Sequence, residues 1–249
     1  MVVENKRGDF RFVKGISPYS AGAAAMPGYE IVRARFARDL PLKAGFAAID
    51  AHLKSARRPR HTLCGMELRS PRPFSFQGFA DFNAGYVEIL KSWDLLHDGL
   101  NPVARTNVAL EIGGPSEPSV HGFSYTAPTE ERSLTFVIAG AGELPEGTLD
   151  PHDVVRRGET SPAAIREKAQ FVMGLMEGRL RELGGDWPAV TATDIYTVHE
   201  IHPFLADVLI RRMGAGAAQG LTWNYARPPI VSIEYEMDLR GCRREIVIG

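Results

Sequence analysis

The sequence is poor in cysteine, because Cys64 and Cys242 are the only two among 249 residues. Two cysteines are too few for the disulfide framework of a small secreted protein and too few for a zinc site of four thiolates. A reducing compartment is therefore expected. Cys64 lies between apolar neighbours in a strand-like run, a setting that is typical of a buried thiol and not of a nucleophile.

The sequence also lacks an excess of one charge and lacks a long apolar run. Its 29 basic and 30 acidic residues give a net charge of −1, whereas domains that bind nucleic acid are usually strongly basic. No run approaches the roughly 20 apolar residues that cross a bilayer, and the opening MVVENKRGDF has no apolar core of signal-peptide type. We therefore expect a cytoplasmic protein that binds neither nucleic acid nor a membrane.

Two parts of the sequence resemble each other at a constant offset. HTLCGMELRSPRPF and VTATDIYTVHEIHPF both read as β-rich runs that end in Pro-Phe, and each precedes a helical stretch with a tryptophan near its end. Phe74 and Phe204 are 130 positions apart, and so are Trp93 and Trp223. A constant offset indicates a duplication. We expect two repeats, residues 1–127 and residues 128–249.

Each repeat predicts the same order of elements: strand, helix, strand, helix, strand, strand. The helix that begins near Ser161 has the clearest signals, because serine is a good N-cap and Pro162 suits the first helical position. The expected elements are strands 29–37, 61–69, 105–112 and 119–127 with helices 41–56 and 78–93, then strands 132–141, 190–201, 230–238 and 243–249 with helices 161–183 and 204–220.

Four short segments follow one another along the chain: ISPYSAG (16–22), FADFNAGYVEIL (79–90), ARTNV (104–108) and ARPPIVSIEYEMD (226–238). They resemble, in turn, the Gly-Pro-Tyr-Ser motif, the Val-Asn-x-x-Tyr helix and the Ala-Arg-Ser/Thr segment of the RidA/YjgF family, and the same arginine segment followed by a Glu-Ile-Glu strand. The resemblance implies an α+β fold of two tandem chorismate-mutase-like repeats, each a mixed β-sheet with two helices packed on one face. It also implies assembly into homotrimers.

Members of that family hydrolyse imines or enamines derived from amino acids. The resemblance implies that Arg105 and Arg227 bind a substrate carboxylate, with Asn83 and Asn107 as further substrate-binding residues. A planar guanidinium suits this role, since it donates two parallel hydrogen bonds to a carboxylate. The expected substrate is a small carboxylate-bearing imine, enamine or strained ring amide or ester.

The resemblance also implies which residues carry the chemistry. Glu234 corresponds to the glutamate that orients the attacking water, and Tyr19 corresponds to a tyrosine of the pocket. In the first repeat His121 stands near the position of that glutamate. No cofactor is expected, and His199 and His202 do not predict a metal site, because they point to opposite faces of a strand.

Simpler explanations compete with each of these roles. Arg105 could form an ion pair with a carboxylate such as Glu111, and Glu234 and Glu236 could share a solvated strand face. The prolines that follow Arg227 would also suit a structural sheet edge. The alternative function is a non-catalytic sensor of a small carboxylate metabolite with the same fold.

Overall fold

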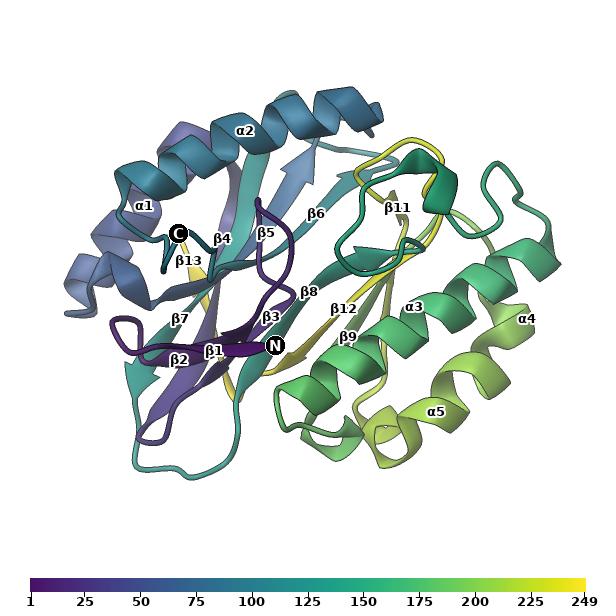
Figure 1. Ribbon diagram of the computed structural model, residues 1–249. Helices are drawn as coiled ribbons and strands as arrows, with labels where there is room; N and C mark the ends of the chain where they lie inside the picture. The colour runs from purple at the N-terminus through teal and green to yellow at the C-terminus, as the bar shows by residue number, and fades with distance from the viewer.

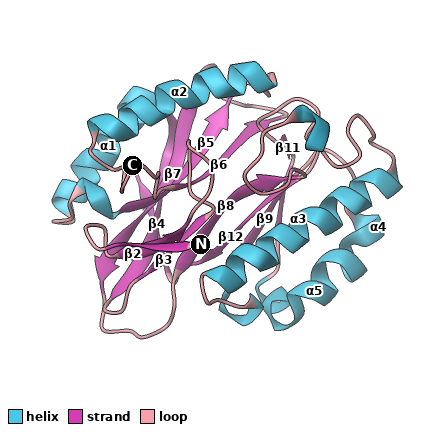
Figure 2. Cartoon of the chain, viewed as in Figure 1, coloured by secondary structure: helices cyan, strands magenta, loops and turns pink.

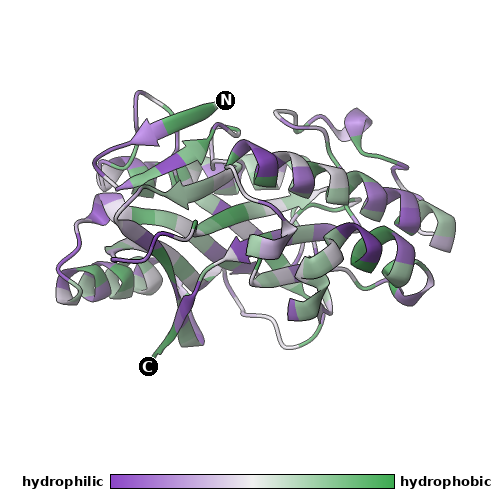
Figure 3. Cartoon of the chain, turned by 90° about the horizontal axis from the view of Figure 1, so that it is seen from below, coloured by the Kyte–Doolittle hydropathy of each residue, from purple (hydrophilic) through white to green (hydrophobic).

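Two mixed β-sheets stack face to face, with helices on both outer sides, in the computed structural model of residues 1–249 (Figures 1 and 2). No helix has both the length and the apolar character that a bilayer span requires. Bands of purple and green alternate along the helices in Figure 3, as expected for helices with one polar and one apolar side.

The first sheet is formed mainly by the first half of the chain. Its strand order is β11-β6-β5-β7-β4-β13, in which β5 and β6 are parallel and β7 is antiparallel to both β4 and β5. Helices α1 and α2 cover its outer face (Figure 1). The bounds are β4 Tyr29–Pro41, α1 Leu42–Ser55, β5 Leu63–Ser70, α2 Phe76–Ser92, β6 Ala104–Leu110, β7 Ser119–Pro128, β11 Ala226–Arg227 and β13 Arg244–Ile248.

The second sheet repeats this pattern and extends it. Its order is β1-β2-β3-β8-β12-β9-β10, so that β10-β9-β12-β8 has the same order and directions as β6-β5-β7-β4. The bounds are β1 Val2–Asn5, β2 Phe10–Val13, β3 Gly22–Ala25, β8 Phe136–Gly142, α3 Pro162–Glu182, β9 Ala192–Tyr196, α4 His202–Phe204, α5 Arg211–Met213, β10 Thr222–Asn224 and β12 Glu236–Gly241.

Each end of the chain belongs to the sheet that is formed mainly by the other half of the chain. Strands β1 to β3, which the sequence pattern did not predict, extend the second sheet through the pairing of β3 with β8. At the other end, β13 pairs with β4 of the first sheet. The division of the chain at residue 127 stays a prediction.

The predicted helix 204–220 is the element that differs most. It is replaced by α4, a π-helical stretch Leu205–Ile210, α5 and a 3-10 stretch Gly214–Gln219. The segment GAGAAQG explains the end of the α-helix, because glycine favours non-helical conformations and Gly214 has a φ of 54°.

The space between the sheets is apolar at one end and polar at the other. Phe10 and Phe12 are fully buried in the apolar part, where they face small residues of the opposite strands. Strand β12 shows how the polar part arises. Leu239 and its alternate neighbours face α3, whereas Glu236, Asp238 and Arg240 are buried on the opposite side of the strand. The polar part leads to a pocket.

Candidate functional site

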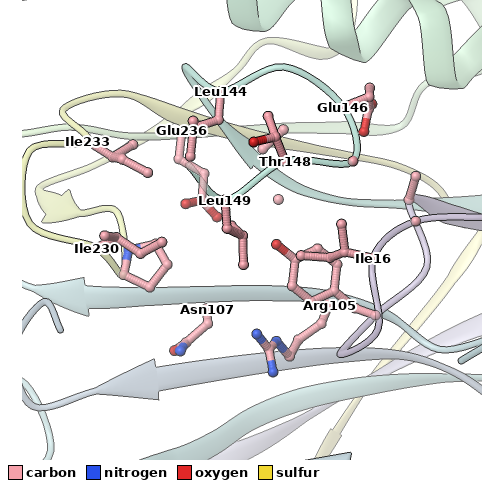
Figure 4. Close-up of a pocket in the computed structure, with 18 of the residues that line it drawn as sticks. Ile16, Arg105, Asn107, Leu144, Glu146, Thr148, Leu149, Ile230, Ile233 and Glu236 are labelled. Carbon is pink, nitrogen blue, oxygen red and sulfur yellow. The ribbon is translucent and has the colours of Figure 1, made fainter. Parts of the chain in front are cut away.

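The pocket lies where β6 of the first sheet meets β8 and β12 of the second. Three loops complete it, residues 15–21, 142–149 and 229–233. Thr106, which lies between Arg105 and Asn107 in the sequence, joins the two sheets, since its hydroxyl donates to Asp238 Oδ2 over 2.7 Å and accepts from the backbone N–H of Gly140 over 3.1 Å. The wall contains charged side chains together with apolar ones, including Leu144, Leu149, Ile230 and Ile233 (Figure 4).

Arg105 is the central cation of the pocket, with 2% of its surface exposed. Its Nη2 donates to Asn83 Oδ1 over 2.7 Å, whereas Nε and Nη1 have no partner. The guanidinium carbon lies 4.7 Å from the ring centres of both Tyr19 and Tyr86. These aromatic faces stabilise the cation without neutralising it, and burial lowers its pKa. The unpaired guanidinium atoms are suited to a ligand anion, because buried charges are otherwise paired.

Two asparagines lie beside Arg105, and one of them, Asn107, adds a donor to the pocket. Asn107 follows it by two positions on β6, so both side chains lie on the same face. Asn107 Oδ1 accepts from Ser70 Oγ over 3.0 Å, and Asn107 Nδ2 is buried without a partner. Asn83, on the buried side of α2, orients Arg105 and does not line the pocket.

Glu236 faces these donors from the opposite sheet. It begins β12, is 4% exposed, and points into the pocket, with Arg105 and Asn107 on the other side (Figure 4). Burial and the neighbouring Asp238 carboxylate raise its pKa well above the usual range, although Arg105 and Arg179 act in the opposite direction. A Cβ atom at Gly140 would stand 2.1 Å from Glu236 Oε1, so any side chain at this position would displace the Glu236 carboxylate.

A second arginine, Arg179 of α3, also lines the pocket. Its Nη1 donates to the carbonyl of Ala139 over 2.8 Å. Its Nε and Nη2 donate to the two oxygens of Glu146 over 2.6 and 3.0 Å. Glu146 belongs to loop 142–149.

Tyr19 approaches the pocket from loop 15–21, which precedes β3. Burial raises the pKa of its hydroxyl, although Arg105 and Arg179 lower it. The neutral phenol can therefore donate a hydrogen bond to a bound oxygen atom.

Four of the residues predicted from the sequence lie outside the pocket lining, namely Asn83, Arg227, Glu234 and His121. Arg227 forms an ion pair with Glu111, with N–O distances of 2.6 and 3.1 Å. Glu234 pairs with His199 over 2.9 Å and is 3.9 Å from Arg227 Nη1.

His121 is likewise occupied elsewhere, because its Nδ1 lies 2.8 Å from Asp39 Oδ1. The structure therefore brings together Tyr19, Arg105 and Asn107, with Asn83 behind the arginine.

Sequence reasoning missed Glu236 and Arg179 as site residues. A signal for Glu236 was present, since it alternates with Tyr235 and Met237 and so lies on the strand face that does not pack against the helices. For Arg179 there was no comparable signal, because it is one of many charged residues on a long helix.

The sequence matches the family described as 2-aminomuconate deaminase CnbZ over residues 2–246. The chain belongs to this family. It is 46% identical over 244 residues to a 2-amino-5-chloromuconate deaminase from Comamonas testosteroni, and the match covers 97% of this chain and 96% of that protein.

Two solved structures are similar at low sequence identity. A chorismatase matches with a TM-score of 0.50 and 12% identity, covering 96% of this chain and 78% of that one. A cyanuric acid hydrolase, described as an innovation by structural concatenation, matches with a TM-score of 0.39 and 9% identity, covering 85% and 67% of the two chains. The first likeness supports the fold alone.

These findings correct the resemblance inferred from the sequence. The assignment to the RidA/YjgF family and to a RidA-like fold of two chorismate-mutase-like repeats is wrong, because the family match covers almost the whole chain and the fold is that of a chorismatase. The short motifs misled because the order of strands and helices expected from them is close to the order found in this chain. The sheets themselves differ from that expectation, because strands from the two ends of the chain join the sheet of the opposite half. The broader prediction of a deaminase is confirmed by the family. The trimer rested on the rejected resemblance and stays a prediction.

Proposed function

We propose that this chain hydrolyses the amino group from 2-aminomuconate or a substituted 2-aminomuconate, releasing ammonia and the 2-oxo acid. One observation carries the proposal: a buried arginine, Arg105, with two unpaired guanidinium nitrogens faces a buried acid, Glu236, across the same pocket. The names of the family and of the 46% identical relative supply the substrate class.

The pocket chemistry suits this substrate. A 2-aminomuconate is an unsaturated dicarboxylate whose amino group is attached to a double bond, so it is an enamine. One of the unpaired N–H groups of Arg105, on Nε or Nη1, would donate to the carboxylate next to the amino-bearing carbon, and the amide of Asn107 would donate to it as well. The apolar residues Ile230 and Ile233 would contact the diene, and their side of the pocket would accept a chlorine substituent.

Glu236 would transfer the protons. In its protonated form it donates a proton to the carbon end of the enamine, so that the bond to nitrogen becomes that of an iminium ion. The resulting carboxylate takes a proton from water as the water oxygen attacks the iminium carbon. Both steps need one carboxyl group with a pKa near the working pH, which is the direction in which burial shifts Glu236.

The tetrahedral intermediate then breaks down. Glu236 returns its proton to nitrogen, the carbon–nitrogen bond breaks, and the hydroxyl proton passes to Glu236, which regenerates its starting form. One enamine and one water thus give one 2-oxo acid and one ammonia. The hydroxyl of Tyr19 would donate to the oxygen atom on which charge develops.

The test is deamination by the purified protein, followed by loss of the diene absorbance and by release of ammonia. Arg105→Lys keeps the charge but loses the planar guanidinium that donates to Asn83 and to a ligand at the same time, and it should lower kcat/KM about 30-fold or more, since charge-assisted hydrogen bonds contribute roughly 1.5–3 kcal/mol. Arg227→Lys is the matched control and should leave kcat/KM unchanged, because Arg227 lies outside the pocket.

Two results would contradict the proposal. One is the absence of ammonia release from both 2-aminomuconate and 2-amino-5-chloromuconate. The other is equal behaviour of Arg105→Lys and Arg227→Lys when both variants melt like the unmodified protein, because the guanidinium of Arg105 would then have no special role.

A further inference from the structure

The pocket contains two arginines, one with unpaired N–H groups and one whose N–H groups are bound to a carboxylate of the protein. Arg105 has unpaired nitrogens. Arg179 also lines the pocket. Its Nε and Nη2 both donate to the Glu146 carboxylate, so this edge of the guanidinium is occupied. A protein carboxylate therefore occupies one of two cationic positions in a pocket for which we have proposed a dicarboxylate.

Arg179 is held in place independently of Glu146. Its Nη1 donates to the carbonyl of Ala139 on β8, and its side chain is 8% exposed. If Glu146 left, the Nε and Nη2 edge would remain directed at the same position and could receive another carboxylate with the same geometry.

The side chain of Glu146 is much more exposed to solvent than that of Arg179. Its side chain is 47% exposed, so its carboxylate can return to water at little cost. Glu143, three residues earlier and directly after β8, is different, because it is fully buried and accepts hydrogen bonds from Lys168 and from the backbone of Glu234 and Tyr235. The start of the loop is thus held in place at Glu143, whereas the carboxylate of Glu146, three residues later, is exposed.

We propose that Arg179 binds the second carboxylate of the substrate and that Glu146 occupies this position until the substrate displaces it. The inference rests on the proposed function for the identity of the substrate. Exchange of one carboxylate for another keeps the buried Arg179 paired throughout, which avoids the large cost of an unpaired buried cation. Glu236 and Tyr19 line the same pocket as Arg105 and Arg179, so the reacting part of the substrate would lie between its two anchored ends.

The proposal makes Arg179 the residue that selects dicarboxylates over monocarboxylates. The experiment measures binding of two stable probes by calorimetry: trans,trans-muconate, which has both carboxylates and no amino group, and sorbate, which has the same trans,trans-diene and a single carboxylate. Arg179→Gln should weaken muconate binding roughly 10- to 100-fold and change sorbate binding little.

Glu146→Gln should act in the opposite direction. Without the competing carboxylate, muconate should bind about 10-fold more tightly, while sorbate should again change little. Arg181→Gln and Glu182→Gln are the matched controls, because both side chains are exposed on the same helix outside the pocket. Neither control should alter the ratio of the two affinities.

Two outcomes would overturn the inference. If Arg179→Gln weakens both probes equally, the arginine only maintains the pocket, and if Glu146→Gln weakens muconate, the glutamate is part of the wall. Should Arg179→Gln fail to fold, the Glu146→Gln result decides alone. These binding results are separate from catalysis: loss of selectivity in Arg179→Gln without any deamination by the unmodified protein would leave this inference standing and remove the proposed function.

Discussion

Lys168 and Glu143 form an ion pair that is completely buried, with 0% of either side chain exposed and 2.8 Å between Nζ and Oε1. The same carboxylate accepts hydrogen bonds from the backbone N–H groups of Glu234 and Tyr235 over 2.7 and 3.1 Å. The pair therefore fixes the chain that leads into Glu236, the proposed proton carrier. Lys168→Met removes the cation and leaves Glu143 as an uncompensated buried charge.

The structure sets the size of the expected effect. Breaking a buried pair from one side costs about 3–5 kcal/mol, and a chain of this length loses roughly 2–4 °C in Tm for each kcal/mol. We expect Lys168→Met to lower Tm by about 6–20 °C near neutral pH. Burial already raises the pKa of Glu143, and loss of Lys168 should raise it further.

This shift fixes the pH dependence of the loss. A carboxyl group with a raised pKa in the folded state binds its proton more tightly when folded, so its contribution to stability falls as pH rises from the unfolded value through the folded one. The deficit of Lys168→Met should therefore be smaller at pH 5 than at pH 8. Urea unfolding at both pH values measures it, and Lys168→Met/Glu143→Gln should recover part of the loss at pH 8.

A deficit below about 1 kcal/mol, or one that is the same at both pH values, would refute the reasoning, since an exposed pair contributes no more than that. The exposed pair Glu88–Lys91 on α2 provides the comparison. Lys91→Met should change the free energy of unfolding by less than about 1 kcal/mol.

Three further outcomes are expected. Glu236→Gln should lower kcat roughly 100- to 10,000-fold with little change in muconate binding, as steady-state kinetics and calorimetry would show. In the unmodified protein kcat/KM should fall as pH rises through the pKa of Glu236, because the proposed cycle starts from the protonated acid, and a pH–rate profile tests the sign. Gly140→Ala should also reduce kcat, because the new Cβ would displace the Glu236 carboxylate, and a crystal structure of the variant would show the displacement.

The sequence motifs identified one side of the pocket. Tyr19, Arg105 and Asn107 line it and Asn83 holds the arginine, although the family on which these residues were chosen is wrong. The residues were found because the short segments ISPYSAG, FADFNAGYVEIL and ARTNV contain them. Their role in binding substrate stays a prediction.

The opposite side of the pocket depends on features that sequence periodicity does not show. The strand prediction for 230–238 placed Glu234 and Glu236 on one face, but the strand begins only at Glu236. Glu234 lies in the preceding loop, where it pairs with His199. Burial of Glu236 arises where the sheets meet, through the contact of β6 with β8 and the hydrogen bond from Thr106 on β6 to Asp238 on β12, which join residues that are distant in the sequence.

The duplicated topology explains why Arg227 does not form a second pocket of the same kind. Strand β6 is parallel to β5, and Met66 pairs with Arg105. The offset of 130 takes Met66 to Tyr196, which pairs with Asn224 on β10. The topological counterpart of Arg105 is therefore Asn224, an uncharged residue whose amide donates to Asp194 over 3.1 Å.

Arg227 instead belongs to β11, which extends the first sheet beyond β6, and its partner there is Glu111. The segments ARTNV and ARPPIVSIEYEMD are thus similar in sequence, but their arginines occupy different positions in the sheet. One half of the chain supplies the unpaired arginine Arg105, and the other supplies Glu236 and the second arginine. Because these groups meet only where the two sheets stack, neither half contains the proposed site alone.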